Sequence, residues 1–323
     1  MKVAIVGYGN LGRGVEAALC AAPDMQAVGI FTRRDPATVK SACGLPVYHM
    51  DALESMTDQI DVVINCGGSA TDLPLSTPAL AENFHVIDSY DTHANILAHR
   101  ACVDAAARKG GKVAIISVGW DPGMFSINRL YAQSILQESK SYTFWGKGVS
   151  QGHSDAIRRI EGVADARQYT VPIDSAVQRV KDGEKPTFTA AQMHERVCYV
   201  AIKEGADAAA IEQAIVTMPN YFAPYKTTVH FVSLEELHRD HAGLPHGGKV
   251  ITSGKAATGS AHTIEYALTL ESNPDFTGSV LVAFARAAYR LGKQGDCGCK
   301  TAFDVAPILL SPEDPEELYK HLL

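Results

Sequence analysis

The stretch that decides the fold is residues 2–22, KVAIVGYGNLGRGVEAALCAA. It begins with an uninterrupted apolar run, Val3–Val6, and an apolar run without polar alternation is typical of a strand buried on both faces. Three glycines follow within six residues, and the segment from Asn10 carries apolar residues at helical spacing. The stretch therefore predicts a buried strand, a tight glycine turn and a helix, in that order.

The glycines have the spacing Gly7-x-Gly9-x-x-Gly12. In a dinucleotide-binding turn, the first glycine allows the tight bend, the second lets the backbone approach a pyrophosphate, and the third permits close packing of helix on strand. The phosphates lie at the helix N-terminus, where N–H groups and the helix dipole favour anions. The spacing alone is a weak signal, but between a strand and a helix it is specific. We expect a dinucleotide cofactor here, with Asn10 and Leu11 beside the glycines.

Apolar runs and helical patterns alternate over the next hundred residues. The runs lie at 26–31, 61–67, 85–90 and 112–119, and helical spacing occurs at 76–84 and 94–111. Near-continuous apolar strands separated by helices indicate a parallel sheet covered on both faces. The predicted fold class is α/β, with a Rossmann-type doubly wound parallel sheet in residues 1–119.

The pattern changes after Pro122. Helices are predicted over 125–139 and 274–295, and period-two alternation between them predicts strands. These strands lie at 141–148, 165–172, 195–202, 226–233, 249–256 and 261–272. Alternating strands with few helices between them indicate an antiparallel or mixed sheet, hence a second, α+β domain. We place this domain at 120–297 and expect residues 298–323 to pack back on the first.

The composition and net charge of the chain limit the classes of function that it can have. The 323-residue chain has a net charge of −7, which argues against nucleic acid as the main partner because phosphate binding needs a basic surface. No apolar run approaches the ~20 residues of a membrane span, and the N-terminus lacks the pattern of a signal peptide. The seven cysteines are scattered and lack histidines at metal-ligand spacing. We expect reduced thiols, no metal site and a cytoplasmic protein.

The end of the second predicted strand distinguishes the two nicotinamide dinucleotides. An NAD site carries Asp or Glu there for the ribose 2′-hydroxyl, whereas arginine accommodates the 2′-phosphate of NADP. This strand ends in Thr32, Arg33 and Arg34, with no carboxylate. The sequence therefore favours NADP; the alternative is that the two arginines are ordinary surface residues.

Polar side chains follow three further strands of the predicted sheet. Small residues follow the third strand at 66–71, Asp91 follows the fourth, and Trp120 and Asp121 follow the fifth. Ligands of such sheets bind beyond the carboxyl ends of the strands. Paired carboxylates beside a nicotinamide can bind an ammonium group or act as a general base. The alternatives are a helix N-cap for the aspartates, above all for Asp91, and core packing for the two tryptophans, Trp120 and Trp145.

Two loops of the second domain carry further candidates. Trp145 opens a glycine-bearing loop that leads into a helix and contains His153. His246 lies in the Pro/Gly turn LPHGGK. A histidine held between proline and two glycines favours exposure to a ligand, although a lone histidine is often structural.

These segments resemble the meso-diaminopimelate dehydrogenase family along nearly the whole chain. The resemblance rests on VAIVGYGNLGR, GIFTRR, GSATD, YDTH, GWDPGMFSINR, FWGKGVSQGHSDAIRRI, TMPNYF, PHGGKVIT, HTIEY and NPDFT. It implies NADP-dependent oxidation of the D-configured amino centre of meso-2,6-diaminopimelate to L-2-amino-6-oxopimelate and ammonia, a reversible reaction of lysine biosynthesis. It also implies a homodimer with a substrate-binding and dimerisation domain.

The resemblance assigns residues to this reaction. The reacting D-centre would be surrounded by Asp91, Trp120 and Asp121. The substrate site would be lined by Trp145, Gln151 and Gly152. The distant L-centre would be held by Thr170, Arg196, His246 and Asn273. The expected cofactor-binding residues are Gly7, Gly9, Asn10, Leu11, Gly12, Thr32, Arg33, Arg34, Cys66, Gly67, Gly68, Ser69, Ala70, Thr71, Ser89 and Tyr90.

The reaction needs a base that deprotonates the ammonium and activates water. Asp121 is the first candidate and His153 the second, with Asp91 as the other carboxylate at the reacting centre. Two alternatives stay open. One is another NADP oxidoreductase, of the dihydrodipicolinate-reductase or sugar-dehydrogenase kind, against which the paired carboxylates argue. The other is an NADP-binding sensor without turnover, against which Arg196 and His246 also argue. Use of 2-oxo acids in the reverse direction is open.

Overall fold

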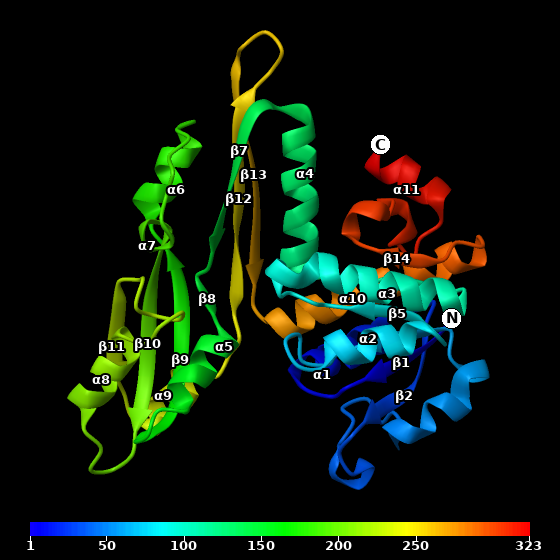
Figure 1. Cartoon of the computed structure of the whole chain (residues 1–323), viewed down its shortest axis with the longest axis horizontal. Coiled ribbons are helices and arrows are strands. Elements are labelled where there is room, and N and C mark those ends of the chain that lie inside the picture. Colours follow the sequence, from blue (N-terminus) through cyan, green and yellow to red (C-terminus); the bar gives the residue numbers. More distant parts are fainter. The chain divides into compact units, whose positions relative to one another are not determined.

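The computed structural model of the chain describes all 323 residues, which form two compact units (Figure 1). Unit 1 comprises Met1–Ile127 and Pro274–Leu323, and unit 2 comprises Asn128–Asn273. Two clusters of buried apolar side chains form the core of unit 1, and two others form the core of unit 2. Each unit therefore buries apolar surface of its own, as a domain does. None of the helices combines the length and hydropathy that a membrane crossing requires.

Unit 1 is built on a seven-stranded sheet in the order β14-β6-β5-β4-β1-β2-β3, and every neighbouring pair is parallel. The strands are β1 (Lys2–Val6), β2 (Gln26–Thr32), β3 (Val47–His49), β4 (Val62–Asn65), β5 (His85–Asp88), β6 (Val113–Ile115) and β14 (Gly298–Lys300). All four residues of β4 are buried, as expected for a sheet covered on both faces. The predicted α/β class with a doubly wound parallel sheet is confirmed.

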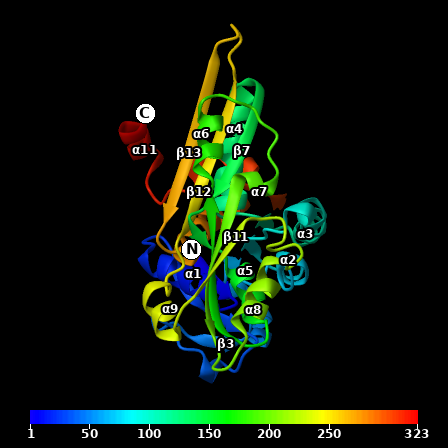
Figure 2. The same cartoon turned by 90° about the vertical axis from the view of Figure 1, so that its left-hand side faces the viewer.

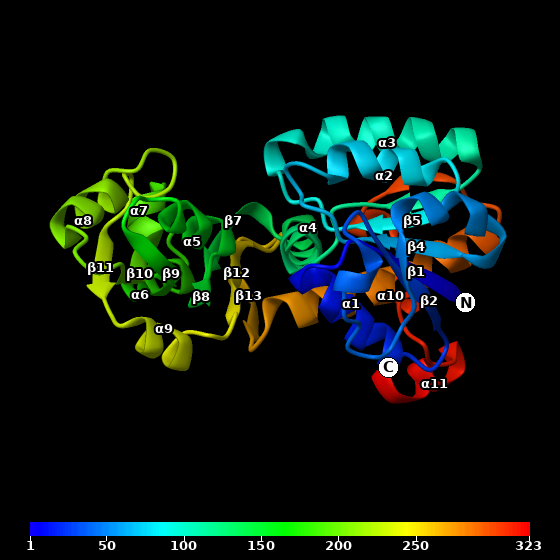
Figure 3. The same cartoon turned by 90° about the horizontal axis from the view of Figure 1, so that it is seen from below.

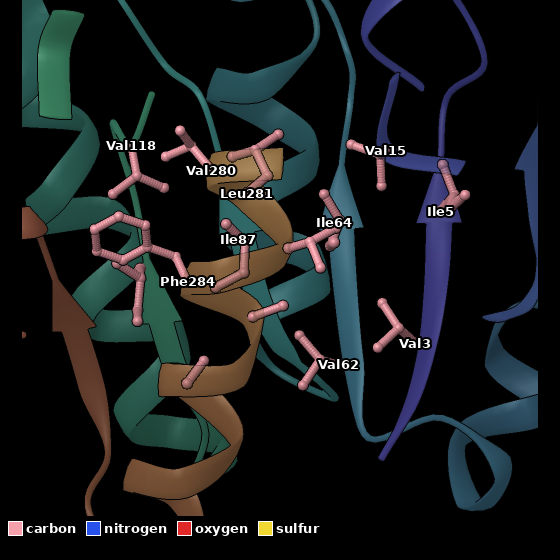
Figure 4. Packing of buried hydrophobic residues seen from close by; sticks show 14 of the residues in the cluster. Val3, Ile5, Val15, Val62, Ile64, Ile87, Val118, Val280, Leu281 and Phe284 are labelled. Atoms are coloured by element: carbon pink, nitrogen blue, oxygen red, sulfur yellow. The ribbon is translucent and has the colours of Figure 1, made fainter. Parts of the chain in front are cut away.

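Helices cover both faces of this sheet, as Figure 3 shows. Val15 and Phe284 lie with Ile64 in the apolar cluster on one face (Figure 4). Leu80 and Val103 belong to the cluster on the other face. The helices of the first face are α1 (Asn10–Ala21) and α10 (Asn273–Lys293), those of the second are α2 (Leu73–Ala81) and α3 (Ile96–Gly110), and α11 (Pro315–Leu322) ends the chain. Short 3-10 turns lie at Pro36–Thr38, Met50–Ala52, Glu54–Gln59, His93–Asn95, Ala302–Asp304 and Pro307–Leu309.

Two features of unit 1 differ from the sequence prediction. Strands β3 and β14 are absent from it, because their sequences, Val-Tyr-His and Gly-Cys-Lys, form no apolar run of the kind that reveals the other strands. The predicted boundaries, 119/120 and 297/298, also differ from the limits of the two units, which fall at 127/128 and 273/274. Helix α10 belongs to unit 1 because its buried face, including Leu281, completes the core on one side of the sheet. The segment after it also lies in unit 1, where β14 pairs with β6.

Unit 2 contains two smaller sheets, ordered β11-β10-β9-β8 and β13-β12-β7. All pairs are antiparallel except β10 with β11, so the predicted α+β domain with a mixed sheet is confirmed. Figure 2 shows β12 and β13 as a long two-stranded ribbon. The strands are β7 (Gln137–Trp145), β8 (Gly148–Val149), β9 (Val163–Pro172), β10 (His194–Ile202), β11 (Thr227–Phe231), β12 (His246–Lys255) and β13 (Ala261–Leu270).

The helices of unit 2 are short. After α4 (Phe125–Ile135), which crosses the division between the units, come α5 (Gln151–Arg158), α6 (Asp174–Lys181), α7 (Ala190–Met193), α8 (Ala208–Val216) and α9 (Leu234–Asp240). Of these, α6 to α9 are absent from the sequence prediction, because none exceeds nine residues and so none displays a sustained helical period.

Candidate functional site

The carboxyl ends of β1, β2 and β4 border a cavity of about 580 Å³ in unit 1. Its lining includes most of the expected cofactor-binding residues, namely Gly7, Gly9, Thr32, Arg33, Arg34, Cys66, Gly67, Gly68 and Thr71. Tyr8, Met50, Asn65 and Asp72 also line it. Ala70 and Tyr90 instead line a neighbouring recess of about 420 Å³.

Each glycine of the fingerprint has the role that its position predicts. Gly7 has φ +87°, which only glycine adopts readily. A Cβ on Gly12 would lie 2.4 Å from the carbonyl oxygen of Gly7, so helix and turn meet too closely for a side chain. A Cβ on Gly9 would have no protein atom within 4 Å, which leaves the backbone there open to a ligand. These three features fit a pyrophosphate at the start of α1.

The two arginines at the end of β2 are held in different ways. Arg34 Nη2 donates to the carbonyl oxygen of Tyr8 at 2.6 Å. Arg33 Nη2 donates to Asp72 Oδ1 at 2.9 Å, and Asp72 Oδ2 accepts the N–H of Gly68 at 2.9 Å. The Gly68 hydrogen bond and the Arg33 guanidinium hold the pKa of Asp72 below its usual range. Because a guanidinium has five N–H donors, each arginine retains donors for a phosphate.

A fully buried carboxylate, Glu16 of α1, supports this arrangement, and no sequence pattern identified it. It accepts hydrogen bonds from the Tyr8 hydroxyl, from Ser41 Oγ and from the N–H groups of Ala42 and Cys43. Burial acts to raise the pKa of Glu16, but these hydrogen bonds outweigh it and hold the pKa below its usual value. Glu16 thus fixes Tyr8, whose carbonyl oxygen in turn fixes Arg34.

The two candidate carboxylates of unit 1 follow β5 and β6, which pair directly. Asp91 is exposed, and its N–H donates to Ser69 Oγ at 2.9 Å, which ties the loops after β4 and β5 together. The N-cap alternative for Asp91 is wrong, because the residues that precede the next helical turns are Thr92 and Asn95. Trp120 is buried with its ring edge-on to Phe125. Asp121 is half-buried.

Arg196 is the central group of the unit 2 site. It is 8% exposed, and its guanidinium donates to Thr170 Oγ1 and lies 4.0 Å from the ring centroid of Tyr225. No carboxylate pairs with it, and its Nε has no hydrogen-bond partner. Burial accordingly lowers the pKa of Arg196. A buried cation without a counter-ion is costly, so this position is suited to bind an anion.

Two uncharged histidines lie near this cation. The pKa values of His153 and His194 both fall to about 4, first because of burial and second because of the Arg196 charge. His194 Nε2 accepts the N–H of Trp145 at 2.9 Å, and its ring stacks on the Trp145 ring. His153 Nδ1 lies 2.7 Å from Ser150 Oγ. At neutral pH both rings are therefore neutral.

Glycines bring the strands of this site close together. A Cβ on Gly148 would lie 2.5 Å from His246 Cγ, and a Cβ on Gly146 would lie 2.1 Å from the carbonyl oxygen of Thr170. Gly146 has φ +110°, which a side chain would disfavour. In the ladder, Thr170 stands opposite both Gly148 and Arg196. The predicted residues Trp145, Thr170, Arg196 and His246 therefore come from adjoining strands, β7, β9, β10 and β12.

The remaining predicted residues lie at the ends of helices. Gln151 and Gly152 are exposed at the start of α5, where Ser150 is the N-cap. The N–H of Asn273 donates to the carbonyl oxygen of Leu244 at 3.0 Å, two residues before His246. Sequence reasoning missed Glu16, Ser150, His194 and Tyr225. Of these, only Ser150 had a signal, as a serine that precedes a helix.

Comparison with known proteins covers the whole chain. The family model for the diaminopimelic acid dehydrogenase C-terminal domain matches residues 119–272. The meso-diaminopimelate D-dehydrogenase of Ureibacillus thermosphaericus is 59% identical over 323 residues, covering 100% of this chain and 99% of the relative. That of Lysinibacillus sphaericus is 56% identical, with the same coverage.

Solved structures of related dehydrogenases also match the whole chain. The structure of C. glutamicum DAP dehydrogenase in complex with DAP matches with a TM-score of 0.91 and 46% identity, covering 100% of this chain and 99% of that one. An engineered D-amino acid dehydrogenase bound to NADP⁺ matches with a TM-score of 0.87 and 45% identity, with the same coverage.

Acid should destabilise unit 2 through His194. Its pKa is about 4 in the folded chain and near 6.5 in the unfolded chain, so the unfolded state binds the additional proton between these values and stability falls as pH drops through this window. The expected loss from pH 7 to pH 5 is about 2 kcal/mol. Urea unfolding at both pH values measures it. His194→Gln, which can still accept the Trp145 N–H, should lose that part of the pH dependence. An unchanged dependence contradicts the prediction.

Proposed function

The chain belongs to the meso-diaminopimelate dehydrogenase family, and from this premise we propose that it oxidises the D-configured amino centre of meso-2,6-diaminopimelate with NADP. The products are L-2-amino-6-oxopimelate, ammonia and NADPH, and the reaction is reversible. The enzyme is an oxidoreductase that acts on a CH–NH₂ group, with a place in lysine biosynthesis.

One observation carries this proposal: the buried guanidinium of Arg196 has no counter-ion. A substrate with a second carboxylate, far from its reacting centre, supplies that counter-ion through charge-assisted hydrogen bonds. Thr170, His246 and Asn273 complete the site for this distant L-centre, and Trp145, Gln151 and Gly152 line it. A simple D-amino acid has no group to place there.

NADP fits the residues at the carboxyl edge of unit 1. The glycine turn at Gly7–Gly12 suits the pyrophosphate, and Arg33 and Arg34 suit the 2′-phosphate. Cys66, Gly67, Gly68 and Thr71 line the same cavity, and Ser89 and Tyr90 follow the neighbouring strand. When bound, NADP⁺ supplies a nicotinamide that accepts a hydride.

The reaction requires the substrate ammonium to lose a proton before the α-hydrogen leaves as hydride. Asp91 and Asp121, at the ends of paired strands, attract the ammonium. Asp121 accepts its proton and later activates the water that adds to the imine, after which ammonia leaves. His153 is a weaker candidate for this base because its ring packs against Tyr221 and Phe222 and its Nδ1 is engaged with Ser150 Oγ. Trp120 orients the reacting centre.

Anchoring of the L-centre also explains selectivity for the D-centre. With the distant carboxylate on Arg196, only one configuration at the near carbon directs its hydrogen to the nicotinamide while its ammonium meets Asp91 and Asp121. Selectivity is then a result of positioning rather than of a separate recognition step.

Substitution of Arg196 tests the proposal directly. The wild-type chain should reduce NADP⁺ with meso-diaminopimelate, measured by NADPH absorbance, but not with the L,L isomer. Arg196→Met should raise KM for the meso isomer about 100-fold or more, because charge-assisted hydrogen bonds to the carboxylate are lost. Arg159→Met, on an exposed residue at the end of α5, is the matched control and should behave as wild type. Absence of turnover in the wild type, with NADP still bound, favours a cofactor-binding sensor instead.

Arg33 should set the preference for NADP over NAD. Arg33→Ala should weaken NADP⁺ binding about 10- to 100-fold, the worth of hydrogen bonds to a charged group, and leave NAD⁺ binding unchanged. Fluorescence titration with each cofactor measures both constants. Lys40→Ala removes an equal charge from an exposed position and serves as the control. Equal losses for the two cofactors contradict a 2′-phosphate contact.

We further propose that the enzyme works as a cytoplasmic homodimer, as the family resemblance implies. Light scattering of the purified chain should give twice the mass of one 34.6 kDa chain. A mass that stays at one chain over micromolar concentrations contradicts the homodimer.

A further inference from the structure

Asp88, the last residue of β5, is fully buried and makes hydrogen bonds to three segments of unit 1. Its Oδ1 accepts the N–H of Tyr90 at 3.1 Å and the N–H of Ser117 at 2.9 Å. Its own carbonyl oxygen accepts the N–H of Val118 at 3.2 Å. One residue therefore holds both the loop that leads to Asp91 and the segment that leads to Asp121.

His99 of α3 completes the arrangement. Its Nε2 lies 2.8 Å from Asp88 Oδ2, and both side chains are buried. Because the other carboxylate oxygen already accepts two N–H groups, we place the His99 proton on Nε2, as the donor to Oδ2. The His99 ring stacks on the Tyr90 ring with 4.2 Å between centroids. The histidine thus fixes both the carboxylate and the side chain of the residue before Asp91.

The position of Asp88 in the sheet explains why this contact matters. The last paired residues of β5 and β6 are Ile87 and Ile115, and beyond them the Val118 N–H still donates to the Asp88 carbonyl oxygen. Asp88 bridges them two residues further on, through Ser117. Ser117 has φ +56°, a left-handed conformation that is unfavourable for a serine and is kept only where neighbouring contacts enforce it. The hydrogen bond from its N–H to Asp88 is such a contact.

We propose that Asp88, fixed by His99, is a positioning residue that sets the loops of Asp91 and Asp121 relative to each other for the reaction. The inference rests on the proposed function, because it assigns a purpose to the alignment of those two carboxylates. A buried carboxylate is costly unless it is fully hydrogen-bonded. The Asp88 side chain adds to the backbone bond between Val118 and Asp88 a second connection between the two loops, at the edge where the chemistry is expected.

Asp88→Asn tests the role with little change in shape. The amide keeps an oxygen for Tyr90 and Ser117 but places an NH₂ group opposite the donor on His99. We expect kcat/KM for meso-diaminopimelate to fall about 10- to 100-fold, the cost of misplacing reacting groups by up to about 1 Å. The dissociation constant of NADP⁺ should change by a smaller factor than kcat/KM, because Asp88 contacts one expected cofactor-binding residue, Tyr90, but does not itself line the cofactor cavity. The primary deuterium isotope effect with α-deuterated substrate should rise as hydride transfer becomes limiting.

Two substitutions of His99 separate positioning from packing. In His99→Gln the side-chain amide keeps an N–H donor near the place of Nε2, so kcat/KM should stay within about threefold of wild type. In His99→Phe the ring can still stack on Tyr90 but donates nothing, so kcat/KM should fall as it does in Asp88→Asn. Equal effects of both substitutions would assign His99 to packing alone and overturn its part in the proposal.

The matched control is Asp24→Asn. Asp24 pairs with the buried Arg286 of α10 at 2.6 and 2.8 Å, so the same chemical change breaks an ion pair of unit 1 far from the loops. This variant should unfold at lower temperature but keep wild-type kcat, KM and isotope effect below its transition. Hydrogen exchange should quicken at residues 89–92 and 117–121 in Asp88→Asn and not in Asp24→Asn, a readout that does not depend on turnover.

The outcomes separate the two proposals. If the wild-type chain turns over meso-diaminopimelate and Asp88→Asn keeps its kcat/KM and isotope effect, the positioning role is wrong and the proposed function stands. If Asp88→Asn loses activity only in proportion to a loss of folded protein, as judged against Asp24→Asn, the role is structural and the inference is again overturned. If the wild-type chain shows no turnover, the proposed function itself fails, whatever the exchange rates show.

Discussion

A parallel sheet brings the carboxyl ends of all its strands to one edge, and the chemistry of unit 1 depends on that constraint. The glycine turn after β1, the arginines after β2 and the small residues after β4 lie far apart in the chain, yet they line one cavity. The same geometry places Asp91 and Asp121 after paired strands. Because the sheet fixes only where each strand ends, buried side chains must fix the loops beyond it. Glu16 does this for the cofactor side and Asp88 for the side of the two carboxylates.

Unit 2 also brings residues that are distant in the chain together, but it does so through close packing of strands at glycines. Its strands belong to two small sheets, and glycines let their backbones approach too closely for side chains. Gly148 lies against the His246 ring, and Gly146 lies against the Thr170 carbonyl. Arg196, opposite Thr170 in the ladder, is buried against Thr170 and the Tyr225 ring. Burial is also the first cause of the lowered pKa values of Arg196, His153 and His194.

Whether the sequence predicted a feature depends on how far apart in the chain the interacting residues lie. The glycine turn, the arginines after β2 and the carboxylates at the strand ends were predictable because each depends on a local pattern and on one rule about sheet edges. Glu16, His194 and Tyr225 were not, because each acquires its role from a partner many residues away: Glu16 from the loop 41–43, His194 from Trp145 and Tyr225 from Arg196. Asp88 sits inside an apolar strand pattern, where an aspartate marks only the end of the strand.

The distribution of charge between the units accounts for the kind of substrate. Unit 1 presents carboxylates at its candidate reacting centre, and unit 2 presents one guanidinium without a counter-ion. Two histidines that lie within the influence of that guanidinium are held neutral, so they add no positive charge beside it at neutral pH. A ligand that lacks the distant carboxylate would leave the guanidinium buried without a counter-ion. The free-energy cost of that unpaired charge is larger than the cost of losing an apolar contact, so such a ligand would bind more weakly. Under the proposed function, selectivity for a dicarboxylate arises from the same burial that makes Arg196 costly for the fold.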